Sequence, residues 1–378
     1  MAGKMRLLGK VLCLTSLVAV IVMTAVEGTW GTALHSTPVF WAAAFLMAVS
    51  LGMTVLDAAK NNGPKPHRLS HVGLLLLILG AFWEALAADE GRITVRTEQA
   101  ADLAVSDEGF AVPLPFRIRL LSFETGYYED GVSPKQYSSR LDIDGKEYVT
   151  SVNHPCLCRG WLIYQSDYDH ENGAYSVLKV VRDPCLPLIF LGMLLLALGA
   201  VTGLRRDWNS RWTVAVILAL AVVFGVISVA RINFGTLMPA LRSLWFVPHL
   251  ALYMLAYSAL AISLVCAVLA APGVRRERLR GISGRLFSTA SSALLLGMLC
   301  GAVWAQVCWG SWWTWDAKEC WAAVTWMLAL VGMHLPERLR RKEWALLVCI
   351  ALSFGAMQVA WYGVESLPAS QYSLHTYK

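Results

Sequence analysis

The stretch LKVVRDPCLPLIFLGMLLLALG, residues 178–199, decides the fold of this chain. Its charged residues end at Asp183, and an apolar run follows that we place at about 186–204. About 20 consecutive apolar residues are enough for a helix to cross a bilayer. The stretch therefore predicts a transmembrane helix that begins directly after a polar region.

The rest of the chain repeats this apolar pattern. Of its 378 residues, 57% are hydrophobic and only 15% are charged, whereas a soluble protein has roughly a quarter charged residues. We therefore predict an all-α polytopic membrane protein with about nine transmembrane helices. The other eight spans are predicted at about 10–28, 38–58, 69–88, 212–230, 246–271, 286–306, 320–335 and 343–363.

Charged loops predict the orientation of these helices. Every second loop is basic, which is typical of cytoplasmic loops. We expect the N-terminus inside, the C-terminus outside, and the first apolar run retained as a span rather than cleaved as a signal peptide. The net charge of +6 is explained by these loops and does not indicate nucleic-acid binding. The basic stretches are residues 1–10, 60–68, 205–211, 275–285 and 338–342.

Residues 89–184 form one sizeable polar stretch, which we predict to be a small external β domain. Alternating patterns such as FRIRLLSF (116–123) are typical of strands. Asp144-Gly145 lies between two such runs, and this dipeptide favours a hairpin turn. The short basic loop at 204–212 suggests a division into two halves, residues 1–205 and 206–378.

Four of the eight histidines lie at informative depths. His71 and His334 are near the inner ends of their spans, so they can share one depth. His249 is near the outer end of its span, and His375 is in the external tail. Two pairs at two depths suggest two ligand sites, because imidazole is a common metal ligand. We assign no ligand role to the remaining four, His35, His67, His154 and His170.

The segment WGSWWTWDAKECWA (309–322) is the densest group of tryptophans. Seven of the 16 tryptophans fall between Trp304 and Trp326. An aromatic belt would scatter tryptophans over many helix ends, so we expect a flat surface for a planar ligand. Asp316 also fits a helix N-cap, with Glu319 completing a capping box. Asp316, Lys318 and Glu319 either orient the ligand, cap the following helix, or do both.

The nine cysteines contain no CxxC pair. Cys156 and Cys158 form a CxC in the predicted external domain, and Cys308 and Cys320 bracket the tryptophan segment. Spacing alone leaves open whether the second pair forms a disulfide.

The tryptophan segment resembles the WGxxWxWDxKExWA motif of the WWD haem-handling proteins. Its WDxKE form is similar to the CcsA (ResC) branch. WFVPHLALYMLAYSALAISLV (245–265) and SLHTYK (373–378) look like the family regions that carry the two outer histidines, here His249 and His375. His334 matches the membrane histidine that follows the motif.

The first half resembles the CcsB (ResB) family. HVGLLLLILGAFWEALAADEGRITV (71–95) is similar to the span that carries this family's membrane histidine, here His71. Residues 114–143 and 152–169 look like its outer domain. The chain thus resembles a CcsB–CcsA fusion, a System II cytochrome c synthetase, over most of residues 69–378.

The resemblance implies a function in cytochrome c biogenesis. Reduced haem b would enter between His71 and His334, reach an outer site, and be joined by thioether bonds to the CxxCH cysteines of apocytochrome c. A thioredoxin-like protein would keep those cysteines reduced, and membrane lipid would surround the helices of this bacterial inner-membrane protein. The implied catalytic residues are His249, His375, Trp309, Trp312, Trp313, Trp315 and Asp316. The implied haem-binding residues are His71, His334, His249, His375, Trp309, Trp315, Asp316, Lys318 and Glu319, with the four histidines as iron ligands.

Two other functions remain open at this point. A haem transporter or chaperone would carry the same motif without attaching haem. A bis-histidine b-type electron carrier would show two histidine pairs at two depths, but it would not need a dense external group of tryptophans.

Overall fold

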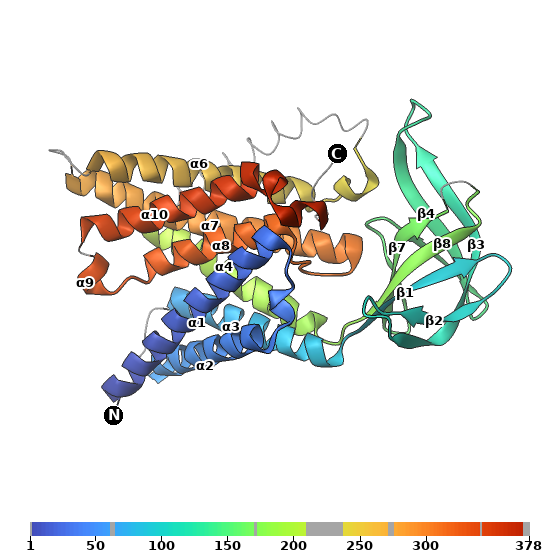
Figure 1. Ribbon diagram of the computed structural model, residues 1–378, viewed down its shortest axis with the longest axis horizontal. Coiled ribbons are helices and arrows are strands. Elements are labelled where there is room, and N and C mark those ends of the chain that lie inside the picture. The colour runs from blue at the N-terminus through green and yellow to red at the C-terminus, as the bar shows by residue number, and fades with distance from the viewer. Residues whose placement is uncertain are drawn as a thin grey trace.

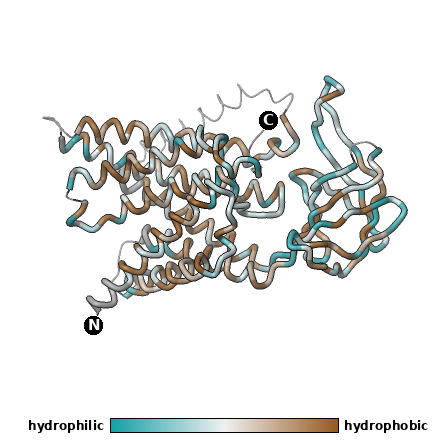
Figure 2. Tube along the Cα trace, in the orientation of Figure 1, coloured by the Kyte–Doolittle hydropathy of each residue, from teal (hydrophilic) through white to brown (hydrophobic). Residues whose placement is uncertain are grey.

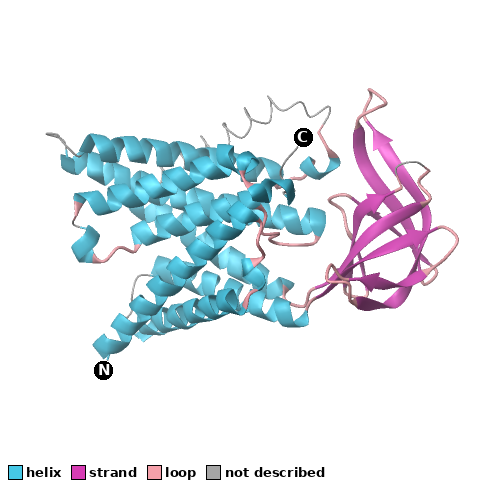
Figure 3. Cartoon of the chain, in the orientation of Figure 1, coloured by secondary structure: helices cyan, strands magenta, loops and turns pink. Residues whose placement is uncertain are grey.

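A computed structural model describes residues 2–60, 65–169, 172–208, 237–270, 276–340 and 342–372. A bundle of long helices forms one part of the molecule, and a β domain lies at one end of this bundle (Figure 1, Figure 3). The α-helices are α1 (Ala2–Trp30), α2 (Pro38–Lys60), α3 (Lys65–Ala87), α4 (Leu186–Trp208), α6 (Phe246–Ala270), α7 (Arg276–Trp309), α8 (Ala317–Met333), α9 (Glu337–Arg340) and α10 (Glu343–Gln358). Shorter helical turns are η1 (Leu34–Ser36), η3 (Pro239–Leu241), η4 (Val359–Gly363), η5 (Val364–Ser366) and η6 (Pro368–Tyr372).

Within the described residues, seven helices are long and apolar enough to cross a membrane. They coincide with seven of the predicted spans, and Figure 2 shows hydrophobic residues along them. The predicted span 320–335 is helix α8, which has 17 residues. The predicted span 212–230 lies outside the described residues, so the expected number of nine stays a prediction. The seven helices are Val11–Trp30, Pro38–Lys60, Arg68–Ala87, Leu186–Leu204, Phe246–Ala270, Glu277–Trp309 and Trp344–Ser366.

Two of the basic stretches lie at the same end of the bundle. The beginning of α1 and the short helix α9 are both at the end away from the β domain (Figure 1). This arrangement is what the predicted orientation requires, with the β domain on the opposite side. The orientation in a membrane itself stays a prediction.

The β domain is an eight-stranded antiparallel sheet with the strand order β5-β4-β3-β2-β1-β8-β7-β6. It confirms the β structure predicted for residues 89–184. The sheet curls, so that β5 and β7 meet where the Thr150 hydroxyl donates to the Ile163 carbonyl over 2.7 Å. The strands are β1 (Asp89–Arg96), β2 (Ala101–Val105), β3 (Ala111–Tyr127), β4 (Pro134–Ile143), β5 (Lys146–Ser151), β6 (Cys156–Cys158), β7 (Trp161–Tyr168) and β8 (Tyr175–Arg182).

Alternating side chains explain why these segments form a sheet around one core. In β3, Phe116, Ile118 and Leu120 are buried while the residues between them are exposed. Strand side chains alternate between two faces, so one face packs inward and the other meets solvent. The hairpin predicted at Asp144-Gly145 is confirmed. Ile143 pairs with Lys146, and the two turn residues have φ of 49° and 81°, as a type I′ turn requires.

The β domain is inserted between α3 and α4, which pack side by side. β1 begins two residues after α3 ends, and α4 begins four residues after β8 ends. Gly73 of α3 allows this close approach, because a Cβ atom there would lie 2.6 Å from the backbone nitrogen of Leu196 in α4. Small residues at such contacts let membrane helices pack closely. Gly73 is two residues from His71, so this contact also fixes the part of α3 that carries His71.

Candidate functional site

The end of the tryptophan segment forms the predicted N-cap of α8. The Lys318 backbone N–H donates to Asp316 Oδ1 over 2.8 Å. Glu319 Oε2 accepts from the backbone N–H groups of Thr314, at 2.8 Å, and of Asp316, at 3.4 Å. The capping box is therefore confirmed, and both acidic residues hold the loop in place.

Trp315 has a strained backbone at this cap. Its φ of 57° lies in the left-handed region, which is rare for a bulky residue. The thiol of Cys320 donates to the Trp315 carbonyl over 3.3 Å. Strained residues of this kind cluster at functional sites, where the surrounding structure holds them.

The indoles of the segment contact three different parts of the bundle. Trp309 packs beside Trp304, with ring centroids 5.5 Å apart. Trp312 is buried against Phe190 of α4, with centroids 4.9 Å apart. Trp315 stacks on the ring of His35, in η1. The expected single flat surface is thus divided, because Trp309 stays on α7 whereas Trp312 faces α4 and Trp315 faces η1.

His249 of α6 lies next to the Trp304–Trp309 pair. Its ring centroid is 5.9 Å from that of Trp304 and 4.7 Å from that of Tyr253. His249 Nδ1 hydrogen-bonds with the Gly297 carbonyl at 2.9 Å. With Nδ1 used in this way, a bond from the ring to a metal ion would use Nε2.

His375 lies outside the described residues. The described chain that precedes it is packed against the beginning of α8, because Val364 and Ala369 share a buried cluster with Ala317. The C-terminal segment therefore reaches the tryptophan segment at Ala369, six residues before His375.

His71 and His334 lie together at the other end of α8. Their ring centroids are 6.0 Å apart and their planes are at 90°. His334 is the C-cap of α8, and its Nδ1 hydrogen-bonds with the Leu330 carbonyl at 2.9 Å. α8 has 17 residues, so a site at each of its ends gives a separation of about 25 Å. Within the described residues, no cluster of three or more His, Cys, Asp or Glu side chains is arranged to hold a metal ion.

The β domain contacts the tryptophan segment directly. Lys179 of β8 bonds to the Ser311 hydroxyl at 2.9 Å and to Glu90 at 3.0 Å. Tyr164 of β7 accepts from the Gln306 amide at 3.4 Å, and burial raises the pKa of its hydroxyl well above the ordinary value. The domain thus holds the segment from the side opposite the bundle.

A second contact joins the β domain to the turn before α6. The Asn153 amide donates to the Pro239 carbonyl over 2.8 Å, and the Tyr128 hydroxyl donates to the Leu237 carbonyl over 3.0 Å. The Trp304 indole N–H donates to the Ala240 carbonyl in the same turn, at 3.0 Å. This turn therefore links the β domain to the helix that carries Trp304.

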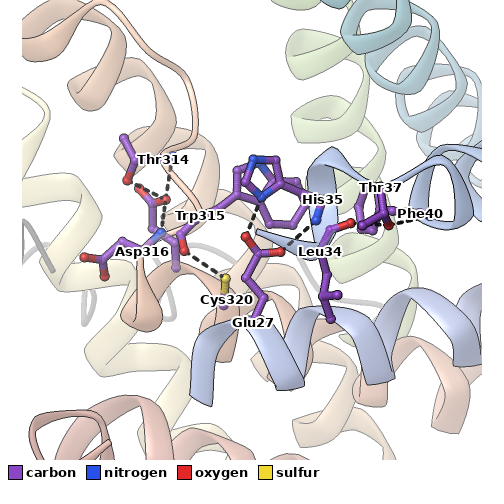
Figure 4. A network of polar contacts seen from close by, with 10 residues as sticks. Glu27, Leu34, His35, Thr37, Phe40, Thr314, Trp315, Asp316 and Cys320 are labelled. Atoms are coloured by element: carbon purple, nitrogen blue, oxygen red, sulfur yellow. Dashed lines mark hydrogen bonds and ion pairs between the residues drawn. The ribbon is translucent and has the colours of Figure 1, made fainter. Parts of the chain in front are cut away.

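Sequence reasoning missed Glu27, His35, Lys179 and Tyr164. His35, assigned no ligand role above, is paired with the buried Glu27 and stacked on Trp315 (Figure 4). The signal for this group was a carboxylate inside the apolar stretch of α1, since such residues in membrane helices are functional candidates. Lys179 and Tyr164 carried no comparable signal in the sequence.

All nine cysteines are free thiols. Cys308 and Cys320 are both buried and unbridged, which answers the question left open by their spacing. Cys156 and Cys158 are side by side on β6 and face the core of the β domain. Burial, and to a smaller extent the neighbouring Cys158, raise the pKa of Cys156 to about 12.

Comparisons with known proteins match the two parts of the chain to two families. The ResB-like family matches residues 68–174, and the Cytochrome C assembly protein family matches residues 184–370. Together with the helical bundle, these matches define a multi-pass membrane protein of cytochrome c assembly. The chain belongs to the fusions of a ResB-like part with a CcsA part, the arrangement of System II cytochrome c synthetases.

Curated relatives support the second part of this assignment. The Cytochrome c biogenesis protein CcsA of Synechococcus sp. (strain RCC307) is 33% identical over 139 residues, covering 27% of this chain and 45% of the relative. The CcsA proteins of Lolium perenne and Zea mays are 36% and 35% identical over 101 residues. These matches cover 27% of this chain and 31% and 30% of the relatives. The chain thus spans less than half the length of these relatives.

Proposed function

We propose that this protein is a cytochrome c synthetase of cytochrome c biogenesis. It would move reduced haem b, its substrate, from the cytoplasmic side of a bacterial inner membrane to the outer face. There it would join the haem vinyl groups to the CxxCH cysteines of apocytochrome c by thioether bonds. The main support for this proposal is the position of His71 and His334. They come from the two family-matched parts, and their ring centroids lie 6.0 Å apart.

The spacing of this inner pair fits two ligands on one metal ion. Metal–imidazole bonds are about 2.0 Å long, so two rings on opposite sides of one ion have centroids about 6 Å apart. Haem iron is commonly held by histidine. His71 and His334 are therefore the proposed iron ligands at the inner site, in agreement with the role that the family resemblance implies.

The proposed outer site is at the beginning of α8. His249 would supply one iron ligand and His375 the other. Packing of Ala369 against Ala317 supports the role of His375, because six residues of chain reach at most about 20 Å. The Trp304 ring packs against both His249 and Trp309, so Trp309 lies near His249. This position supports a contact between Trp309 and the haem plane. Asp316 and Glu319 would shape the loop, while Lys318 is the proposed partner of a haem propionate.

Catalysis at this outer site would consist mainly of positioning. Holding the vinyl carbon and the thiol in attack geometry supplies up to about 7–11 kcal/mol. Trp312, Trp313 and Trp315 would shape the loop that faces the apocytochrome. The partners in this scheme are apocytochrome c, a thioredoxin-like thiol reductant and membrane lipid, and the two working halves are residues 1–205 and 206–378.

The first experiment is a haem spectrum of the protein purified in detergent. Wild type, His249→Ala and His375→Ala are compared, each with and without added imidazole. We expect haem in the wild type, a changed spectrum in both variants, and recovery with imidazole. Unchanged spectra in the variants would contradict the outer ligand assignment.

Co-expression with an apocytochrome separates a synthetase from a haem transporter. The host lacks its own maturation system, and covalent haem is detected on the cytochrome after denaturing electrophoresis. A synthetase gives covalent haem, whereas a transporter or chaperone gives haem-loaded membrane protein only. An electron carrier would instead be identified by quinol-driven reduction of its bound haem without any covalent product.

A further inference from the structure

Glu27 of α1 is a buried carboxylate in a helix long enough to span a membrane. Its side chain is 4% exposed. One oxygen, Oε2, accepts from the backbone N–H of His35 over 3.0 Å, and the other contacts His35 Nδ1 (Figure 4). A buried carboxylate is costly unless it is paired. Both oxygens of Glu27 are committed to His35, so the carboxylate holds this one imidazole in a fixed orientation.

This contact determines which nitrogen of His35 can act as a base. A proton on Nδ1 that is shared with Glu27 leaves Nε2 unprotonated in the neutral ring. The His35 side chain is 32% exposed, and the described part of the chain offers Nε2 no hydrogen-bond partner. An imidazole with a carboxylate behind it is the arrangement that stabilises a protonated ring in general acid–base catalysis.

His35 is also joined to the tryptophan segment. Its ring stacks on the indole of Trp315 with centroids 4.7 Å apart and planes 3° apart. The helix that carries Glu27 packs closely on α8, since a Cβ atom at Gly28 would lie 2.7 Å from Cβ of Cys320. Glu27 and His35 lie outside residues 68–174 and 184–370, the two ranges that match known families. The family matches therefore do not include this pair.

We propose that Glu27 and His35 are the acid–base pair for thioether formation at the tryptophan segment. This inference rests on the proposed function and assigns its proton transfers. His35 Nε2 would take the proton of a CxxCH thiol, and the imidazolium would then give that proton to the terminal carbon of a vinyl group, which becomes a methyl group. The thiolate sulfur would bond to the inner carbon as that proton is transferred. One S–H bond and one C=C π bond are exchanged for one C–S and one C–H bond, and there is no net oxidation or reduction.

The test uses full-length, haem-loaded protein and a reduced synthetic peptide that contains CxxCH, under anaerobic conditions. His35→Phe keeps a flat ring against Trp315 but has no base, whereas His35→Ala removes both ring and base. We expect both variants to keep the haem spectrum of the wild type and to attach haem about 100-fold more slowly. Added imidazole is expected to raise the rate of His35→Ala but not that of His35→Phe, in which the phenyl ring fills the space.

The controls separate this inference from the function on which it rests. Wild type with the same imidazole concentration shows any effect of imidazole on the haem iron itself. If the wild type attaches no haem, the proposed function fails. If the wild type attaches haem and His35→Phe does so at the same rate, the acid–base role is wrong and the ring only supports Trp315.

A second measurement needs neither haem nor peptide. Nitrogen-15 NMR of histidine-labelled protein identifies the His35 signals by their loss in His35→Phe. We expect the neutral form with the proton on Nδ1, and we expect Glu27→Gln to weaken that preference. A proton found on Nε2 in the wild type would overturn the proposal.

Discussion

His71 of α3 and His334 at the end of α8 face each other with ring centroids 6.0 Å apart and planes at 90°. Residues far apart in the sequence thus meet across the junction of the two family-matched parts. Gly73, beside His71, lets α3 and α4 pack closely, and the end of α8 fixes the place of His334.

Loss of either histidine of this pair is expected to remove haem from the inner site. We predict that His71→Ala and His334→Ala each lower the haem content of purified protein, with recovery when imidazole is added. The reason is that one remaining imidazole leaves the iron with an incomplete ligand set. His154→Ala, in the β domain, is the matched control and should keep the wild-type spectrum. Equal haem content in all three variants would argue against this assignment.

Gly310 is expected to tolerate no side chain. Its φ is 67°, and an added Cβ atom would lie 2.7 Å from the ring of Tyr164. We predict that Gly310→Ala destabilises the protein by about 1–2 kcal/mol from the left-handed backbone alone, measured by thermal unfolding in detergent. Gly355→Ala is the control, because it lies in helix α10 with nothing within 4 Å of its added Cβ. The substitution at Gly355 should be neutral or slightly stabilising.

Substitutions at the α8 cap distinguish its structural role from ligand binding. Asp316→Ala removes the acceptor for the Lys318 N–H and should cost about 1 kcal/mol of stability, while Asp316→Asn should cost less. Lys318→Met keeps that backbone bond and should leave the unfolding temperature unchanged while it weakens haem retention. If Lys318→Met lost as much stability as Asp316→Ala, a weaker haem retention would reflect unfolding and would no longer support the proposed propionate contact.

The Cys156 thiol of the CxC pair is expected to be unreactive at neutral pH. The ordinary cysteine pKa of 9.0 is raised to about 12 at Cys156, mainly by burial. The thiol therefore stays protonated as the pH rises through 9, and thiolate forms only near pH 12. We predict slow alkylation of Cys156 in folded protein at pH 8, followed by mass spectrometry, and rapid alkylation after denaturation. Rapid labelling of the folded protein would show that the β-domain core opens at this strand.

Local patterns in the sequence predicted local structure well. Apolar runs predicted the described spans, Asp144-Gly145 predicted the hairpin, and Asp316 with Glu319 predicted the capping box. Each of these structures depends on residues that are close together in the sequence, so their spacing is enough to predict it. The shared depth of His71 and His334 followed from counting residues along helices.

Contacts between distant segments were not predictable in this way. The stacking of His35 on Trp315 joins residues 280 positions apart, and no spacing rule connects them. The density of tryptophans suggested one flat surface, but the φ of Trp315 and the cap at Asp316 turn the indoles apart. The φ of Trp315 and the cap at Asp316 depend on how the whole loop packs, which the spacing of residues in the sequence does not specify.

The length of α8 limits how a substrate can pass between the two proposed sites. A helix of 17 residues is a stiff spacer, and its ends stay about 25 Å apart while the helix remains intact. A metal ion bound by His71 and His334 cannot exchange directly onto a ligand at the beginning of α8. Any molecule that visits both sites must fully leave the first before it binds the second, so the two occupancies are separate events in time.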